Sequence, residues 1–238
     1  VFLITSSDVV AETPNANRHV ENYGNGWFRI SITYTPNGTS STFFQLFGDL
    51  GTPKEGFYIF GAQVEEQSKT TSYIPTSGTI ATRLEDAVTG AGDATTFNST
   101  EGVLYFEGSA LTDGDSVRLI SLSDGTNDNL VMLRYDTTAG RSTVFLRGNG
   151  GTYALKTVSG VTQTDNNKVA LVWDTTNFSI WINGVEVGTV ATNDLPVGLD
   201  TLSLTQPTGG NEFFGKVKSL ITFNTALTDA ELECLTTI

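Results

Sequence analysis

Apolar and polar residues alternate along short stretches of this chain, and residues that favour turns separate one stretch from the next. The clearest example covers residues 27–35, where Phe28, Ile30, Ile32 and Tyr34 share one face of an extended strand and polar residues occupy the other. Long stretches with the 3.6-residue period of a helix are absent from the sequence. The pattern therefore predicts an all-β protein.

The strands become dense after residue 101, with Asp-Gly and Gly-rich turn signals between them. In one hairpin, Asn183-Gly184 predicts a type I′ turn, whose twist matches that of the flanking strands. Short strands at such close spacing predict a two-sheet β-sandwich. The predicted strands are residues 102–108, 116–122, 129–135, 142–147, 152–158, 167–173, 178–183, 185–190, 201–205 and 216–223.

One short helix is predicted at residues 225–235. Thr228 is placed as its N-cap, and Glu231, three residues later, completes a capping box.

The first part of the chain, residues 1–64, offers fewer strands, predicted at residues 1–5, 27–35, 42–48 and 56–64. A β-sandwich usually needs about seven strands or more. We therefore expect half of a sandwich, truncated at its N-terminus or completed by other chains.

Residues 65–94 are expected to connect this part to the sandwich at residues 95–238. The connector is polar, yet it contains Tyr73-Ile74-Pro75, and the residue before a proline is driven to extended geometry. This pattern favours a strap that docks on a neighbouring surface, and a flexible linker is the alternative.

The charge excludes some partners. The chain has 13 basic and 26 acidic residues, a net charge of −13 that is spread over both parts. Nucleic acid and anionic membrane surfaces are therefore poor partners, and a neutral glycan is favoured over an acidic one unless a local basic patch exists. The single cysteine, Cys234, cannot form an internal disulfide.

Two motifs in the second part resemble the laminin-G-like branch of the concanavalin A-like lectins and glucanases. Trp173-Asp174 leads into a strand ending at Asn183-Gly184, and the Leu-Thr-Asp-Ala-Glu pattern starts at Leu227. The resemblance implies a concanavalin A-like two-sheet sandwich. That family includes binders, structural domains and enzymes, so it does not by itself assign an activity.

The first part resembles a module of bacteriophage tail, fibre and other virion proteins. The matching motifs are YGNGWFR from Tyr23, GAQVE from Gly61, SYIPT from Ser72, and Thr82-Arg83. The resemblance implies a carbohydrate-binding-module-like jelly roll followed by a lectin-like domain, in a virion protein that associates with other virion subunits, as a trimer by analogy with fibres.

Catalytic patterns are missing from the sequence. The Glu-x-Asp-x-x-Glu motif of the related glucanases does not occur. A Ser-His-Asp triad would have to use His19, the chain's one histidine, and the sequence has no Gly-x-Ser-x-Gly motif to supply the serine. We therefore predict a protein that is not an enzyme, with a polysaccharide-degrading enzyme of unrecognised site as an alternative.

Sugar binding needs aromatic faces with amide groups around them. Trp181 is the main candidate because it lies opposite the apolar face of its strand, on the side of Asn183, and Tyr153 and Phe213 are aromatic residues at loop edges. Burial in the core is the alternative for each aromatic residue.

Calcium is a possible cofactor, because laminin-G-like domains often hold one ion at a loop rim. The candidate ligands are Asp113 and Asp115 in one turn and Asp124 and Asp128 in another. Local capping of the turn backbone is the alternative.

We therefore expect a phage virion component whose lectin-like domain binds host-surface carbohydrate. The alternative is a purely structural virion subunit that binds no glycan.

Overall fold

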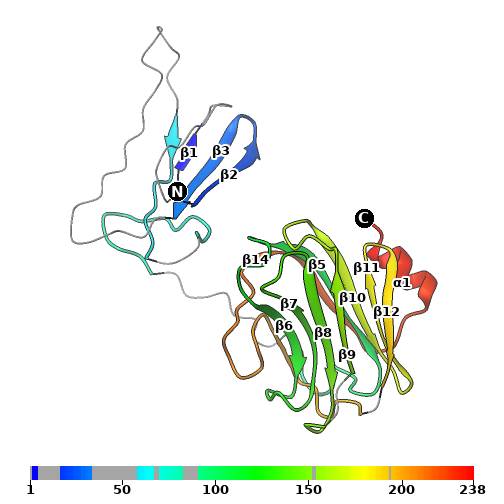
Figure 1. The fold of residues 1–238 in the computed structure, drawn as a ribbon. Helices are drawn as coiled ribbons and strands as arrows, with labels where there is room; N and C mark the ends of the chain where they lie inside the picture. Colours follow the sequence, from blue (N-terminus) through cyan, green and yellow to red (C-terminus); the bar gives the residue numbers. More distant parts are fainter. Residues whose placement is uncertain are drawn as a thin grey trace. The chain divides into compact units, whose positions relative to one another are not determined.

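The computed structural model divides the chain into two compact units, Val1–Glu85 and Asp86–Ile238 (Figure 1). The structure describes residues 2–4, 17–33, 58–66, 70–82, 91–151, 154–192 and 194–238.

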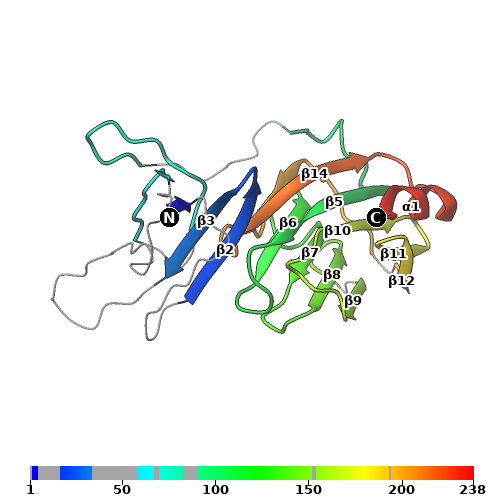
Figure 2. The ribbon, with the colours of Figure 1, turned by 90° about the horizontal axis from the view of Figure 1, so that it is seen from above.

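The second unit is a sandwich of two five-stranded antiparallel sheets (Figures 1 and 2). Sheet B has the order β12-β11-β10-β5-β14, formed by Val185–Ala191, Asn177–Ile182, Asn167–Trp173, Gly102–Ala110 and Gly215–Phe223. Sheet C has the order β13-β6-β7-β8-β9, formed by Thr201–Ser203, Arg118–Ser123, Leu130–Tyr135, Arg141–Arg147 and Ala154–Ser159.

This architecture confirms the all-β, concanavalin A-like sandwich, and each strand predicted after residue 101 is present. The β11–β12 hairpin turns as predicted, because Asn183 and Gly184 both have positive φ, 52° and 83°.

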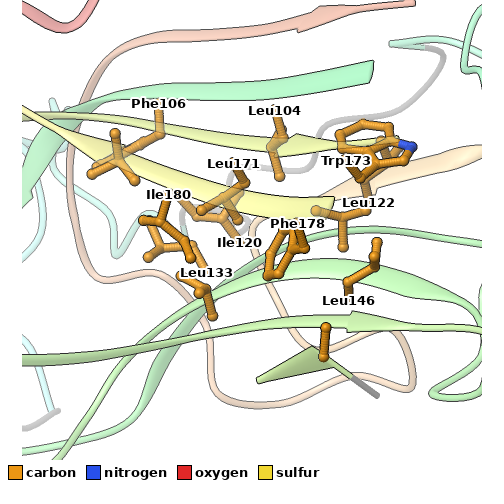
Figure 3. Packing of buried hydrophobic residues seen from close by; sticks show 14 of the residues in the cluster. Leu104, Phe106, Ile120, Leu122, Leu133, Leu146, Leu171, Trp173, Phe178 and Ile180 are labelled. Atoms are coloured by element: carbon orange, nitrogen blue, oxygen red, sulfur yellow. The ribbon is translucent and has the colours of Figure 1, made fainter. Parts of the chain in front are cut away.

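The core between the sheets takes alternate residues of the central strands, such as Val131, Leu133 and Tyr135 of β7. Figure 3 shows apolar side chains of both sheets pointing toward one another, among them Leu104 and Leu171 of sheet B and Ile120 and Leu146 of sheet C. Trp173 is fully buried in this core, as predicted, and Gly102 leaves room for its ring, since an added Cβ would lie 2.6 Å from it.

A second, smaller apolar cluster lies on the outer face of sheet B, under helix α1 (Asp229–Thr236). Leu232 of α1 is 1% exposed and packs with Tyr105, Ala170 and Trp181 of the sheet. The predicted capping box is confirmed, with Thr228 as the N-cap and Glu231 bonded back to it. No helix in the described part of the chain is long and apolar enough to cross a membrane.

The first unit contains sheet A, with the order β2-β3-β1-β4. Its strands are Asn17–Gly24, Trp27–Thr33, Phe2–Ile4 and Ile59–Phe60. Strand β2 was not predicted, and the predicted strand at 42–48 lies outside the described residues. The jelly-roll assignment of this unit stays a prediction.

The connector motif packs within the first unit. The side chain of Gln63 accepts a hydrogen bond from the Ile74 amide at 2.6 Å, and Glu65 accepts one from the Thr71 hydroxyl at 2.6 Å. Gly61 makes room for the Tyr73 ring, because a Cβ there would lie 3.0 Å from it. These contacts tie residues 71–74 to residues 61–65 within the first unit. The docking strap and the flexible linker both stay predictions for residues 65–94.

We expect Leu232→Ala to destabilise the second unit by about 2–4 kcal/mol, because it leaves a cavity between α1 and sheet B. Urea unfolding followed by tryptophan fluorescence measures the change, since Trp181 lies in the same cluster. The exposed Cys234 on the same helix gives the control, and Cys234→Ala should change stability by less than about 0.5 kcal/mol. Equal effects of the two variants would show that α1 is not anchored through Leu232.

Candidate functional site

The outer face of sheet C carries a row of polar and apolar side chains that alternate with the core residues. Where Val131, Leu133 and Tyr135 of β7 point inward to the core, Met132 and Arg134 point outward. On β8 and β9 the outward positions are Arg141, Thr143, Phe145, Arg147, Leu155 and Thr157. The β6 margin of this face is covered, since the buried Ser121 donates to the Thr205 carbonyl at 2.7 Å.

Asp136 joins two arginines at one end of this face. Arg134 Nε donates to its Oδ1 at 2.7 Å, and Arg141 Nε donates to its Oδ2 at 3.0 Å. The hydroxyl of Thr143 also donates to Oδ2, at 2.7 Å. The Asp136 side chain is 4% exposed, whereas those of Arg134 and Arg141 are 32% and 42% exposed. We call these three residues the arginine pair on Asp136.

The arrangement leaves donors for a ligand. Within the described residues, neither Arg134 nor Arg141 uses its terminal Nη atoms in another hydrogen bond. A guanidinium group presents its N–H donors in a fixed planar fork that matches a carboxylate. Two cations around one carboxylate also leave a local positive charge, in a chain of net charge −13.

The acidity of Asp136 follows from its partners. Burial acts to raise the pKa of Asp136, but the hydrogen bonds from Thr143 and Arg141 and the charges of both arginines outweigh it. The pKa therefore lies below its ordinary value, and Asp136 is ionised at neutral pH.

An apolar strip adjoins the arginine pair. The Arg134 guanidinium lies over the Phe145 ring, 5.1 Å from its centroid. Phe145 is paired across the sheet with Met132 and with Leu155, which is 40% exposed. Thr143 is paired across the sheet with Arg134 and with the exposed Thr157, and the two threonine hydroxyls lie 3.4 Å apart. The Thr143 side chain is buried. The face thus combines cations, the Thr157 hydroxyl and apolar surface.

Gln163 holds the turn that carries the pair. It is fully buried, and its Nε2 donates to the Arg141 carbonyl at 2.8 Å and to the Asp136 carbonyl at 3.1 Å. Its Oε1 accepts from the Gly114 amide at 3.2 Å. The β7–β8 turn is therefore fixed to a second loop by one amide side chain.

The predicted sugar-binding residues lie elsewhere. Trp181 is 7% exposed and belongs to the cluster beneath α1, so it presents no open ring face. Asn183 accepts from the Lys168 amide of the neighbouring strand β10 at 2.9 Å, and the Phe213 ring lies 5.2 Å from the Phe106 ring. Tyr153 lies outside the described residues. The structure does not bring Trp181, Asn183 and Phe213 together into one site.

The predicted calcium ligands serve local hydrogen bonds. Asp113 accepts from the Gly140 amide at 2.7 Å, and Asp115 pairs with Arg118. Asp124 caps its own turn through the Thr126 amide at 2.9 Å, and Asp128 lies 3.9 Å from Arg147. Among the residues that the structure places, no three His, Cys, Asp or Glu side chains form a group that could hold a metal ion. Calcium binding stays a prediction.

His19 lies on β2 in the first unit, with its side chain mostly exposed and 3.7 Å from Glu21.

The alternation along β8 is a sequence signal for this polar face. Arg141, Thr143, Phe145 and Arg147 alternate with core residues, and this polar and aromatic pattern marks the exposed side of a strand. The geometry of the β7–β8 turn places Asp136 between the two arginines. Alternation of polar and apolar residues alone does not predict this geometry.

The sequence matches the family model of the concanavalin A-like lectin/glucanases superfamily over residues 108–233, which is more than half of the chain. The chain therefore belongs to this superfamily. A search of curated proteins found no match.

Solved structures share the fold. The CBM40 of the Ruminococcus gnavus IT-sialidase bound to alpha2,3 sialyllactose is 20% identical, with a TM-score of 0.52, over 65% of this chain and 97% of that one. The same CBM40 bound to alpha2,6 sialyllactose is 19% identical, with a TM-score of 0.51, over 64% and 97%. The NanB sialidase of Streptococcus pneumoniae is 20% identical, with a TM-score of 0.50, over 60% and 25%.

We expect Asp136→Asn to destabilise the protein by about 2 kcal/mol at neutral pH, because it leaves two arginines without their shared carboxylate. A carboxyl whose folded pKa is lowered stabilises the protein above its unfolded pKa of about 3.9, and this stabilisation is lost as the pH falls through the folded value. The difference between wild type and variant should therefore be constant from about pH 5 to 7 and shrink below about pH 4. Urea unfolding at each pH measures it, and a difference that persists unchanged at pH 3 would contradict the assignment.

Proposed function

We propose that the second unit is a non-catalytic glycan-binding module that binds an acidic sugar on the outer face of sheet C. The observation that carries this proposal is the arginine pair on Asp136. The Asp136 carboxylate accepts from Nε of both guanidinium groups, and no described residue is bonded to their Nη atoms. The ligand carboxylate would accept from these donors, and the apolar strip at Phe145 and Leu155 would contact the sugar beside it.

A local patch explains why an acidic sugar is favoured in spite of the net charge. The expectation of a neutral glycan depended on there being no basic patch, and Arg134 and Arg141 form one. Charge-assisted hydrogen bonds from a planar fork are stronger than those between neutral groups.

Similarity to other proteins supports the same ligand class. Two of the structures with this fold are described as CBM40 domains bound to sialyllactose, whose sialic acid carries a carboxylate. At about one fifth sequence identity the likeness itself concerns the fold, so the ligand is inferred from the arginine pair.

The chemistry of Asp136 favours binding over hydrolysis. A glycosidase needs a carboxylic acid with a raised pKa beside a second carboxylate. Asp136 has a lowered pKa and is bonded to two arginines, which is unsuitable for a general acid.

We further propose that the protein works in a phage virion, where it would bind a host-surface glycan. The support is the resemblance of GAQVE and SYIPT to motifs of virion proteins. Gln63 of the GAQVE motif accepts a hydrogen bond from the Ile74 amide within SYIPT, and Glu65 accepts one from the Thr71 hydroxyl directly before SYIPT. The two motifs therefore form one structural unit.

Binding is tested with a glycan array followed by calorimetry with alpha2,3 sialyllactose, with calcium and with a chelator. We expect Arg134→Ala and Arg141→Ala each to weaken binding roughly tenfold or more, because a hydrogen bond to a charged group contributes about 1.5–3 kcal/mol. Binding should also weaken as salt rises.

Lys218→Gln is the control, since it removes a cation that pairs with Glu107 on sheet B. It should leave affinity unchanged. An array without any bound glycan, or wild-type affinity in both arginine variants, would refute the binding site. A calcium requirement would support the calcium prediction.

Virion assembly predicts that the protein associates with itself, as a trimer by analogy with fibres. Light scattering of the purified chain measures its mass, and we expect about three times the chain mass of 25.5 kDa. A stable monomer at micromolar concentration would contradict this prediction and would leave the glycan proposal untouched.

A further inference from the structure

The turn before Arg141 is held by the loop between β5 and β6, residues 111–117. Asp113 of this loop accepts a hydrogen bond from the Gly140 amide, at 2.7 Å, through its Oδ1 atom. Gly140 directly precedes Arg141 in the chain. One carboxylate from a distant part of the sequence is therefore bonded to the residue next to an arginine of the pair.

The same loop lies directly against the backbone of the turn. Gly114 has a φ of 75°, and a Cβ added there would lie 2.3 Å from the Ala139 nitrogen. The Gly114 amide donates to the Gln163 side chain at 3.2 Å, and Gln163 in turn donates to the Arg141 carbonyl at 2.8 Å. A residue without a side chain is required where the loop meets the turn.

A second loop holds the other side of Gly140. The Gly140 carbonyl accepts from the Gly160 and Val161 amides, at 2.9 and 3.2 Å. With Asp113 bonded to its amide, both polar groups of Gly140 are bonded to other loops. These contacts therefore set the position of Gly140 and of the Arg141 backbone that follows it.

The two arginines differ in how their backbones are held. Arg134 lies within β7 and is paired with Leu119 of β6 and Thr143 of β8. Arg141 is the first residue of β8, directly after the turn. Ladder hydrogen bonds hold a residue inside a strand, whereas the end of a strand follows the turn beside it. Loss of the loop contact should therefore displace Arg141 and leave Arg134 in place.

We propose that Asp113 is a positioning residue for the arginine pair on Asp136. Its hydrogen bond to Gly140 would hold Arg141 where its guanidinium group binds the ligand carboxylate together with that of Arg134. This inference rests on the proposed function, because it concerns the same site. Two donors that share one carboxylate lose affinity when either shifts, since a hydrogen bond weakens with distance and with misalignment.

Charge and position predict opposite effects for Asp113. Removing an acidic residue near the site should, by charge alone, favour an acidic ligand. Removing the residue that holds Arg141 should weaken binding instead. The sign of the change in affinity thus separates a positioning role from a purely electrostatic one.

Calorimetry of the full chain with alpha2,3 sialyllactose tests the proposal. We expect Asp113→Ala to weaken binding roughly three- to tenfold, and no more than Arg141→Ala does, because it displaces Arg141 without removing it. Asp113→Asn keeps an oxygen that can accept from the Gly140 amide, so it should bind at least as tightly as wild type. Unchanged or tighter binding in Asp113→Ala, or equal weakening in both variants, would overturn the inference.

The arginine variants show whether Asp113 acts through Arg141. In the Arg141→Ala background, Asp113→Ala should not weaken binding further, because the residue that it positions is gone. In the Arg134→Ala background it should weaken binding as it does in wild type. Equal weakening in the two backgrounds would contradict the proposal.

Asp174→Ala is the matched control. Asp174 also accepts from turn amides, those of Thr176 and Asn177 at 2.6 and 2.7 Å, but its turn joins β10 and β11 of sheet B. This variant should lose stability to a similar degree and keep wild-type affinity. Binding that weakens as much as in Asp113→Ala would show that general destabilisation explains the effect, and would overturn the inference.

A measurement without glycan separates this inference from the proposed function. The Nε–H groups of Arg134 and Arg141 both donate to Asp136, at 2.7 and 3.0 Å, and NMR reports on each of them. We expect Asp113→Ala to shift or broaden the Arg141 Nε–H signal and to leave that of Arg134 unchanged. A wild-type chain that binds no glycan would refute the proposed function, whereas an unchanged Arg141 signal would refute the positioning role whether or not a glycan binds.

Discussion

The packing of sheet B on sheet C is the interaction on which the second unit depends, because the shared core decides which side chains face outward. On β7 the core takes Leu133 and Tyr135, so Arg134 must point to the other side. A shift of one residue in the pairing would exchange the two faces. The arginine pair on Asp136 is therefore placed by the same register that buries the core, and the site inherits the rigidity of the sandwich.

The outer faces of the two sheets differ in composition and in what covers them. Sheet B presents Val103, Ala170 and Trp181 outward, and this apolar surface is covered by Leu232 of α1. The outward residues of sheet C include Arg134, Arg141 and Thr157, which are in contact with solvent. Helix α1 thus covers the apolar outer face of sheet B, whereas Arg134 and Arg141 on sheet C stay partly exposed.

Local patterns predicted the strands, the Asn183-Gly184 turn and the capping box at Thr228, because neighbouring residues determine all three. Strand β2 was missed, since its sequence NRHVENYG shows little alternation. Trp181 would alternate in the same way whether its face were open or covered, and the helix that covers it comes about fifty residues later. Contacts between distant segments, such as Gln63 with Ile74 or Gln163 with the β7–β8 turn, likewise have no local sequence signal.

The proposed ligand and the protein are both acidic, and the repulsion between them depends on the distance between their charges. At physiological salt, charges more than about 8 Å apart in water are largely screened, so the net charge of −13 acts weakly on a bound carboxylate. Arg134 and Arg141 would contact that carboxylate directly, and the low local dielectric of a half-buried site strengthens the attraction. The remaining acidic surface would act mainly on approach, where it slows association and suppresses non-specific binding of polyanions. Affinity and selectivity would then come from different charges. The contacting arginines would bind the carboxylate, and the distant acidic residues would repel ligands that carry many negative charges.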